Sequence, residues 1–303
     1  MARPGGAARA AIARWAAMAL VAVAAAVGGC GGDGDPTPAA PAASVPPAPE
    51  ASASASRAPA VPPLCDRLRV RVVGRVGAPA GELSGLVRSS DGGFWAHNDS
   101  GDAPRILRLA NDGAVRREVA VSGAEHVDWE DIAIRGRTLY IGDIGDNLAQ
   151  RPEIAVYRMR ETSTVAEKIT LRYPDGPHDA EAVLVDPRDG TIVIVTKNFS
   201  GPAGVYVGRG LRRVATLKDL GPITAGDVSA DGGTIALRGY DKAYIWTRRG
   251  GESLARAFKR KPCIAAANLL AEGQGETLAL SRDGRTFWTV PEGTRPALRR
   301  YGR

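Results

Sequence analysis

Acidic side chains recur in this sequence at the beginning of short stretches that alternate apolar and polar residues. In two stretches the acids stand two positions apart, as Asp128 with Glu130 and Asp179 with Glu181. Because side chains two positions apart project from the same face of a strand, both carboxylates of each pair can point in one direction. Strand starts contribute Glu82, Asp128, Glu130, Asp179, Glu181, Asp227 and Glu276, and two Asp-x-Gly-Asp loops add Asp99 and Asp143.

Carboxylates gathered at one place repel one another and raise each other's pKa, so such a group persists best around a cation. Hard oxygen ligands of this kind suit calcium or magnesium, and we expect calcium. The aspartate spacing and terminal glutamate of an EF-hand are absent from the sequence. A turn-forming role is equally open for the two Asp-x-Gly-Asp loops, because Asp and Gly are ordinary turn residues. Strand starts have no such need for Glu, which favours a functional role there.

The histidines and two basic residues stand close to these acidic positions. A zinc site would need the imidazoles of His97, His126 and His178 to converge, and we rank it below calcium. His97 and His178 are also candidates for a general acid or base. Lys197 and Arg238 end the second strands of later repeats, where they could hold an anionic group beside a cation. A solvated rim of mixed charge is the alternative.

Five segments of the chain align with one another, which indicates a repeat architecture. They align at Ser84, Glu130, Glu181, Gly226 and Glu276. The intervals between these positions are 46, 51, 45 and 50 residues. Short alternating strands separated by Gly-containing turns follow each position, and a period of this length is typical of a four-stranded propeller blade. The sequence therefore predicts an all-β, five-bladed propeller over residues 64–303.

The last repeat, Glu276 to Arg303, is one strand short. We expect the N-terminal strand Arg67 to Val76 to supply the missing outer strand and close the ring. A β-sandwich would not require a regular period, and six blades would leave one incomplete. One short helix is expected, at Glu252 to Phe258.

Ring closure gives a role to two of the three cysteines. Cys65 opens the closing strand, and Cys263 lies on the exit from the neighbouring fourth blade. An even pair in an oxidising compartment predicts a disulfide. In the chain-entropy model a bridge that closes a loop of about 200 residues adds at most about 5 kcal/mol. Two independent buried thiols are the alternative.

Residues 1–29 have the features of an export signal: three arginines and then an unbroken apolar run, Trp15 to Val27, that is too short to span a bilayer. The segment Val27-Gly-Gly-Cys30 resembles a bacterial lipobox, in which the cysteine is diacylated. We therefore expect a lipoprotein anchored through Cys30 to the outer face of the cell membrane. Cleavage near residues 24–26 is the alternative. Residues 30–63, rich in Pro, Ala and Ser, predict a disordered tether.

The overall charge says little about partners, because the formal net charge of +7 falls to +4 once the three arginines of residues 1–29 are removed. Arginine and lysine do not interleave with aromatic residues, so we expect no nucleic-acid partner. The sequence motifs of serine hydrolases, zinc metalloproteases and P-loop nucleotide-binding proteins are absent. We expect a monomer.

Several segments together resemble a group of uncharacterised actinobacterial propeller proteins that are secreted or lipid-anchored. They are Leu83–Val87, His97–Asp102, Asp128–Asp131, Gly142–Asn147, His178–Ala182 and Gln274–Glu276. The resemblance covers nearly all of residues 64–303 and implies the propeller fold, but no reaction. More distantly, the strand starts are similar to those of esterase-like and phytase-like propellers, which implies calcium bound by acids of the channel.

Two functions of different classes follow. The first is a tethered envelope module that binds a divalent cation and a small molecule or polysaccharide at the acidic mouth of the channel. The alternative is a metal-dependent hydrolase of a phosphoester, ester or lactone. In that case His97 or His178 would transfer protons and Lys197 or Arg238 would hold the anion. The metal would lie against Glu130, Asp143, Glu181 and Glu276. A two-carboxylate glycosidase is a third hypothesis.

Overall fold

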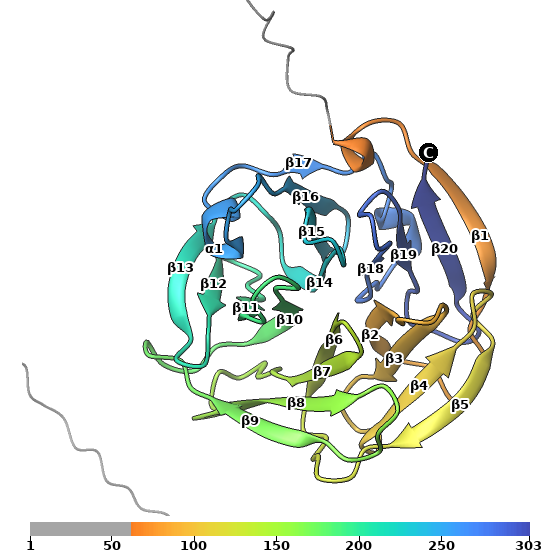
Figure 1. Ribbon diagram of the computed structural model, residues 1–303, viewed down its shortest axis with the longest axis horizontal. Coiled ribbons are helices and arrows are strands. Elements are labelled where there is room, and N and C mark those ends of the chain that lie inside the picture. Colours follow the sequence, from red (N-terminus) through yellow and green to blue (C-terminus); the bar gives the residue numbers. More distant parts are fainter. Residues whose placement is uncertain (1–61) are drawn as a thin grey trace, which may run out of the picture. The chain divides into compact units, whose positions relative to one another are not determined.

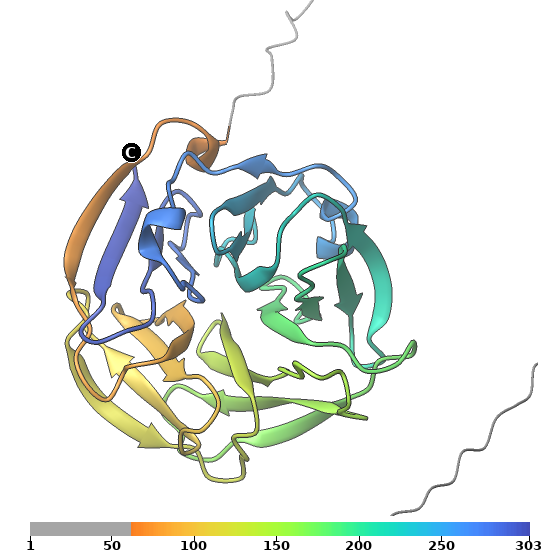
Figure 2. The same ribbon diagram turned by 180° about the vertical axis from the view of Figure 1, so that it is seen from behind.

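The computed structural model describes residues 62–303. Strands within this range form five four-stranded antiparallel sheets. The sheets follow one another around a ring, each with one edge strand at the centre and the opposite edge strand outside (Figure 1). Figure 2 shows the same ring from behind. The predicted all-β, five-bladed propeller is confirmed.

Four blades use their strands in chain order. Blade 1 consists of β2 (Leu83–Arg88), β3 (Phe94–Asn98), β4 (Arg105–Leu109) and β5 (Val115–Ala120). Blade 2 consists of β6 (Trp129–Arg135), β7 (Thr138–Asp143), β8 (Ile154–Arg160) and β9 (Glu167–Leu171). Blade 3 consists of β10 (Ala180–Val185), β11 (Ile192–Thr196), β12 (Ala203–Val207) and β13 (Arg212–Leu217). Blade 4 consists of β14 (Ile223–Val228), β15 (Thr234–Gly239), β16 (Ala243–Thr247) and β17 (Cys263–Ile264).

The fifth blade combines both ends of the described chain. It consists of β18 (Ala279–Leu280), β19 (Phe287–Thr289), β20 (Ala297–Gly302) and β1 (Arg69–Arg75). Strand β1 pairs antiparallel with β20 as the outermost strand, as the closing strand was predicted to do. Single turns of 3-10 helix stand before β1 (Pro63–Cys65) and before β18 (Leu270–Glu272).

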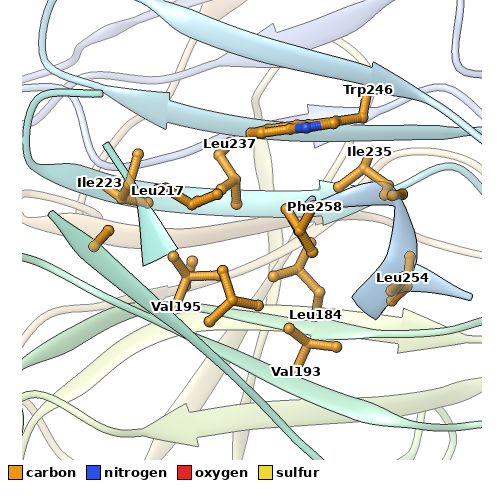
Figure 3. Close-up of a cluster of buried hydrophobic side chains, with 14 of the residues drawn as sticks. Leu184, Val193, Val195, Leu217, Ile223, Ile235, Leu237, Trp246, Leu254 and Phe258 are labelled. Carbon is orange, nitrogen blue, oxygen red and sulfur yellow. The ribbon is translucent and has the colours of Figure 1, made fainter. Parts of the chain in front are cut away.

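Apolar clusters fill the spaces between neighbouring blades. Figure 3 shows the cluster between blades 3 and 4, where α1 (Leu254–Ala257) covers one side. Phe258 follows this helix and meets Trp246 edge to face, with 5.0 Å between the ring centroids. The helix is shorter than the predicted span, because Ser253 caps its beginning and Phe258 caps its end. Side chains from both blades therefore make one continuous core.

Four of the inner hairpins share an irregularity at the same place. The register between the first and second strand shifts around Ser84, Glu130, Glu181 and Thr224. An extra residue of this kind is a β-bulge, which bends the strand and re-aims a side chain. The sequence alignment put Gly226 at this position of blade 4, whereas the register puts Thr224 there. The fourth repeat is therefore aligned two residues earlier than predicted.

A disulfide joins Cys65, which lies before β1, to Cys263 in β17, and their Cα atoms are 6.0 Å apart. This confirms the predicted bridge between the closing blade and blade 4. Cys30, the export signal of residues 1–29 and nearly all of the tether of residues 30–63 lie outside the described residues. Within residues 62–303, no helix has both the length and the apolar character needed to cross a bilayer.

Candidate metal centre at one end of the channel

Carboxylates from four blades converge at one end of the central channel. They form three overlapping groups, and within each group the offered oxygen atoms lie within 4.8 Å of one another. The groups are Asp99 with Asp128 and Glu130, Asp99 with Glu276 and Glu292, and Glu130 with Asp179 and Glu181. The structure thus brings together six of the eight acids predicted as metal ligands, and adds Glu292.

The bulges explain why the glutamates reach this place. Glu130 and Glu181 occupy the bulged position of blades 2 and 3, close to the beginning of β6 and β10. Both side chains are almost completely buried. Ser84, at the same position of blade 1, donates a hydrogen bond from its Oγ to the backbone oxygen of Glu130 at 2.7 Å. A Cβ atom at Gly145 would clash with the carboxylates of Asp128 and Glu130, so this glycine leaves room for both acids.

Glu181 has two carboxylate oxygens in different situations. Oε1 forms an ion pair with the ammonium group of Lys197, and both side chains are nearly buried. Oε2 is buried and has no hydrogen-bond partner among residues 62–303. Burial raises the pKa of Glu181 well above its usual value, although Lys197 opposes this shift. A buried carboxylate oxygen without a partner is costly, so this atom points to a missing ligand.

Neighbouring acids are also harder to ionise than free carboxyl groups. Burial raises the pKa of Glu130 well above its usual value, and the charge of Glu181 adds to the shift. Burial and then Asp99 raise the pKa of Asp128 to about 6. Burial and a hydrogen bond with Glu276 raise the pKa of Glu292 to about 8. The mouth therefore carries protons near neutral pH that a cation would displace.

Lys197 lies beside an aromatic pair at the rim of this mouth. Its Nζ is 5.3 Å from the ring centroid of Phe199 and 5.8 Å from that of Tyr240. The two rings stack with 6.5 Å between centroids, and the Tyr240 hydroxyl donates a hydrogen bond to Glu276 at 3.0 Å. Phe199 is largely exposed. Of the two predicted anion-holding residues, Lys197 is therefore the one at the mouth.

Arg238 lies inside the protein instead. Its guanidinium is fully buried, pairs with Glu272 at 3.1 Å and donates a hydrogen bond to the backbone oxygen of Thr277 at 3.0 Å. A Cβ atom at Gly275 would clash with the guanidinium. These contacts tie blade 4 to the segment that leads into blade 5, so the structure places Arg238 in the wall rather than in the mouth.

Two of the predicted metal ligands lie outside the converging groups. Asp143 accepts a hydrogen bond from the backbone N–H of Asp128 at 3.0 Å and pairs with Arg151 at 2.9 Å, so it holds the loop after β7. Asp227 accepts backbone hydrogen bonds from Val228 and Leu280, both at 2.7 Å, and so links blade 4 to blade 5. Asp227 stands toward the other end of β14 because the bulge falls at Thr224, not at Gly226.

The three histidines do not converge on one another. His97 is completely buried, and burial lowers its pKa to about 4. His126 stacks on Trp129 with 4.3 Å between centroids. His178 shares its Nε2 between Asp175 at 3.0 Å and the Tyr206 hydroxyl at 2.9 Å. The groups of converging ligand atoms found in residues 62–303 contain no histidine, so the structure supports no three-histidine zinc site.

Glu292 is the site residue that the sequence analysis missed. It lies in the loop after β19, the second strand of blade 5. Asp99 lies in the corresponding loop of blade 1, and Asp143 is the last residue of β7, directly before the corresponding loop of blade 2. The Asp-x-Gly-Asp pattern does not occur in this loop, so only a rule that took any acid after a second strand would have found Glu292.

The class of the protein, a five-bladed β-propeller, rests on its strand pairing. No protein-family model matches the sequence, and no curated protein matches it. Among solved structures, a gluconolactonase from Xanthomonas campestris shares 11% identity at a TM-score of 0.44, over 73% of this chain and 71% of that chain. A chain of the nidogen/laminin complex shares 16% identity at a TM-score of 0.46, over 70% of this chain and 73% of that chain.

Proposed function

We propose that the acidic end of the channel binds a divalent cation, calcium by preference, and that the domain is a metal-dependent hydrolase of an ester, lactone or phosphoester. The observation that carries the cation site is the buried Glu181 Oε2, which has no partner within the described chain and lies among converging carboxylates. Glu130, Asp179 and Glu181 would hold the ion, with Asp99 and Asp128 adjoining. Oxygen donors of this number and charge suit calcium.

Hydrolysis is favoured because the mouth holds proton-transfer groups next to the proposed ligands. A bound cation supplies polarisation of a carbonyl or phosphoryl oxygen. Glu292 lies outside the group Glu130, Asp179 and Glu181 that would hold the ion, and burial and Glu276 raise its pKa to about 8 in the metal-free protein, so it could give a proton to a leaving group. Asp128, with its pKa raised to about 6 by burial, can take a proton from water. The proposed acid, Glu292, and the proposed base, Asp128, are thus carboxyl groups, and neither role needs His97.

A non-catalytic module that binds a cation and a small or polymeric ligand is the second candidate. It is favoured by the burial of His97 and Arg238, which removes from the mouth two residues predicted to act on a substrate. In that case the exposed ring of Phe199 beside Lys197 would form part of the ligand surface.

Metal analysis and turnover separate the two candidates. Protein purified without chelator is analysed for bound metal, then tested on glucono-lactone, 4-nitrophenyl acetate and 4-nitrophenyl phosphate with and without chelator. We expect stoichiometric metal and hydrolysis that chelation abolishes and calcium restores. Metal without turnover favours the binding module, and protein that never retains a divalent ion contradicts both.

The cellular location is part of the proposal. The lipobox-like segment that ends at Cys30 and the resemblance to lipid-anchored propellers support a domain tethered outside the cell membrane. A hydrolase or binding module there would meet small molecules or polysaccharides of the envelope.

A further inference from the structure

A cavity of about 380 Å³ lies at the end of the channel opposite the carboxylates. Its lining comes from the ends of first strands, such as Arg88 in β2 and Val228 in β14, whereas the acids lie at strand starts. The turns that follow these strands complete it with Ser90, Arg137 and Arg282. All five blades contribute, since Pro187 comes from blade 3. Cavities that hold small organic ligands begin at about this size.

The positive charges of the lining are arranged on one side. Arg282, Arg88 and Arg137 come from blades 5, 1 and 2, which are consecutive around the ring. The lining from blades 3 and 4 consists of the uncharged Pro187, Val228 and Ala230 together with the buried acid Asp227. A basic arc therefore faces a largely apolar wall.

Two of the three arginines are free to bind a ligand. Within residues 62–303, the Arg282 side chain is exposed and forms no hydrogen bond or ion pair. Arg137 has a side chain 59% exposed, and its Nε is 3.9 Å from Glu161. That carboxylate is already engaged by hydrogen bonds from Ser89 at 2.6 Å and from the indole of Trp95 at 2.9 Å. Arg137 therefore keeps most of its hydrogen-bonding capacity.

The third arginine supplies a fixed positive charge. The Arg88 guanidinium lies 4.5 Å from the ring centroid of Phe94 and 4.8 Å from that of Trp288, and it donates a hydrogen bond to Asn111 at 2.9 Å. Stacking on two rings holds the group in place without neutralising it. Burial, and to a lesser extent the positive charge of the nearby Arg108, lower its pKa.

Asp227 is the acid that lines this cavity. Both of its carboxylate oxygens accept backbone hydrogen bonds, from Val228 and Leu280. Burial raises its pKa to about 7, so it holds a proton more readily than an exposed aspartate does. It opposes an anion less than an exposed aspartate would.

We propose that this cavity binds an organic phosphate, with the phosphoryl oxygens on Arg137 and Arg282 near Arg88 and the organic part against the apolar wall. Guanidinium groups match phosphate geometry, and more than one of them is needed to balance a dianion. A cavity of this volume leaves room beyond the phosphate for an organic group. The site is separate from the proposed metal centre and does not depend on it.

Titration calorimetry at low salt tests the proposal with phenylphosphonate, which cannot be hydrolysed at its P–C bond. We expect it to bind more tightly than inorganic phosphate, which lacks the apolar part, and than benzoate, which carries a single charge. The double variant Arg137→Gln/Arg282→Gln should weaken phenylphosphonate binding at least about tenfold. Glu181→Gln, which alters the opposite end, should leave it unchanged.

A matched double variant controls for general attraction by positive charge. Arg160→Gln/Arg285→Gln removes two exposed arginines from the same two blades, at the end of β8 and in the turn before β19, that do not line the cavity. It should bind phenylphosphonate like the wild type. Equal weakening in both double variants, or no binding of phenylphosphonate by the wild type at millimolar concentration, would overturn the proposal. Melting temperatures close to that of the wild type establish that each variant is folded.

Discussion

Glu181 combines two opposed features in one side chain. One oxygen is neutralised by Lys197, and the other is buried without a partner among the described residues. A lone buried carboxylate could take a proton, but the neighbouring Glu130 and Asp179 make a divalent ion a better counter-charge for the group as a whole. The residue is therefore where cation binding can be tested most directly.

Glu181→Gln should weaken calcium binding at least about tenfold, because one charge and one ligand oxygen are lost. In the wild type, calcium at about a hundred times its dissociation constant should stabilise the fold by about 2.7 kcal/mol. Thermal shift with calcium, magnesium and chelator measures both effects. Glu82→Gln is the control, since Glu82 is an exposed acid at a strand start outside the converging groups. A wild type whose melting temperature ignores all three additions would contradict the metal site.

The stability of the metal-free protein should fall as pH rises. Burial raises the pKa of Asp128 to about 6 from 3.8 and that of Glu292 to about 8 from 4.5, so both bind protons more tightly in the folded chain. Their stabilising effect is present below the unfolded pKa and is lost as pH rises through the folded pKa. Melting temperatures of chelated protein should therefore decrease between pH 4.5 and 8.

Glu292→Gln should flatten the upper part of that decrease, above about pH 6, because the variant lacks the group with the higher pKa. In the Glu82→Gln variant, the melting temperature should fall with pH as steeply as in the wild type. If the melting temperature of the chelated wild type rises between pH 4.5 and 8, the pKa values of these acids are not raised in the folded protein.

At the scale of single elements, β1 is the strand on which ring closure depends. It pairs with β20 along its whole length, and its removal would expose the edge of blade 5. Deletion of residues 64–76 should lower the melting temperature far more than deletion of residues 31–60. Cys65→Ser separates the loss of the strand from the loss of the disulfide. Equal melting temperatures for the two deletions would contradict the closing role of β1.

The repeat period was sufficient to predict the blades, because each blade must place the same strands at the same radius. It was less reliable within a blade. Glu130 and Glu181 were aligned correctly, because both segments contain Asp-x-Glu. In blade 4 the bulged residue is Thr224, which is not acidic, so the nearby Asp227 was taken as the metal ligand of that blade. Arg238 was misplaced for another reason. Its burial depends on Glu272, a partner far along the chain that no local pattern reveals.

At the scale of the whole molecule, the two ends of the channel differ in charge. Carboxylates gather at one end, and three arginines line the cavity at the other. Opposite ends can therefore attract solutes of opposite charge, and the attraction should weaken as ionic strength rises. Each end can be occupied without displacing a ligand from the other.

Anchoring is a prediction about the whole chain. Cys30→Ser should move the protein from the membrane fraction to the soluble fraction, because Cys30 is the lipid attachment point that the sequence offers. Fractionation of cells that express the wild type or the variant measures this. Retention of the variant in the membrane fraction would contradict the lipoprotein prediction. The disulfide variant Cys65→Ser should remain in the membrane fraction.

The position of the disulfide would have a mechanical consequence if the domain is tethered as proposed. Cys65 precedes β1, so tension applied through the preceding chain reaches the bridge before it reaches the closing strand. The force then passes through Cys263 into blade 4 instead of peeling β1 away from β20 one hydrogen bond at a time. With the bridge oxidised, a pull through the proposed tether would leave the ring closed, whereas with the bridge reduced the same pull would first separate the closing strand from β20.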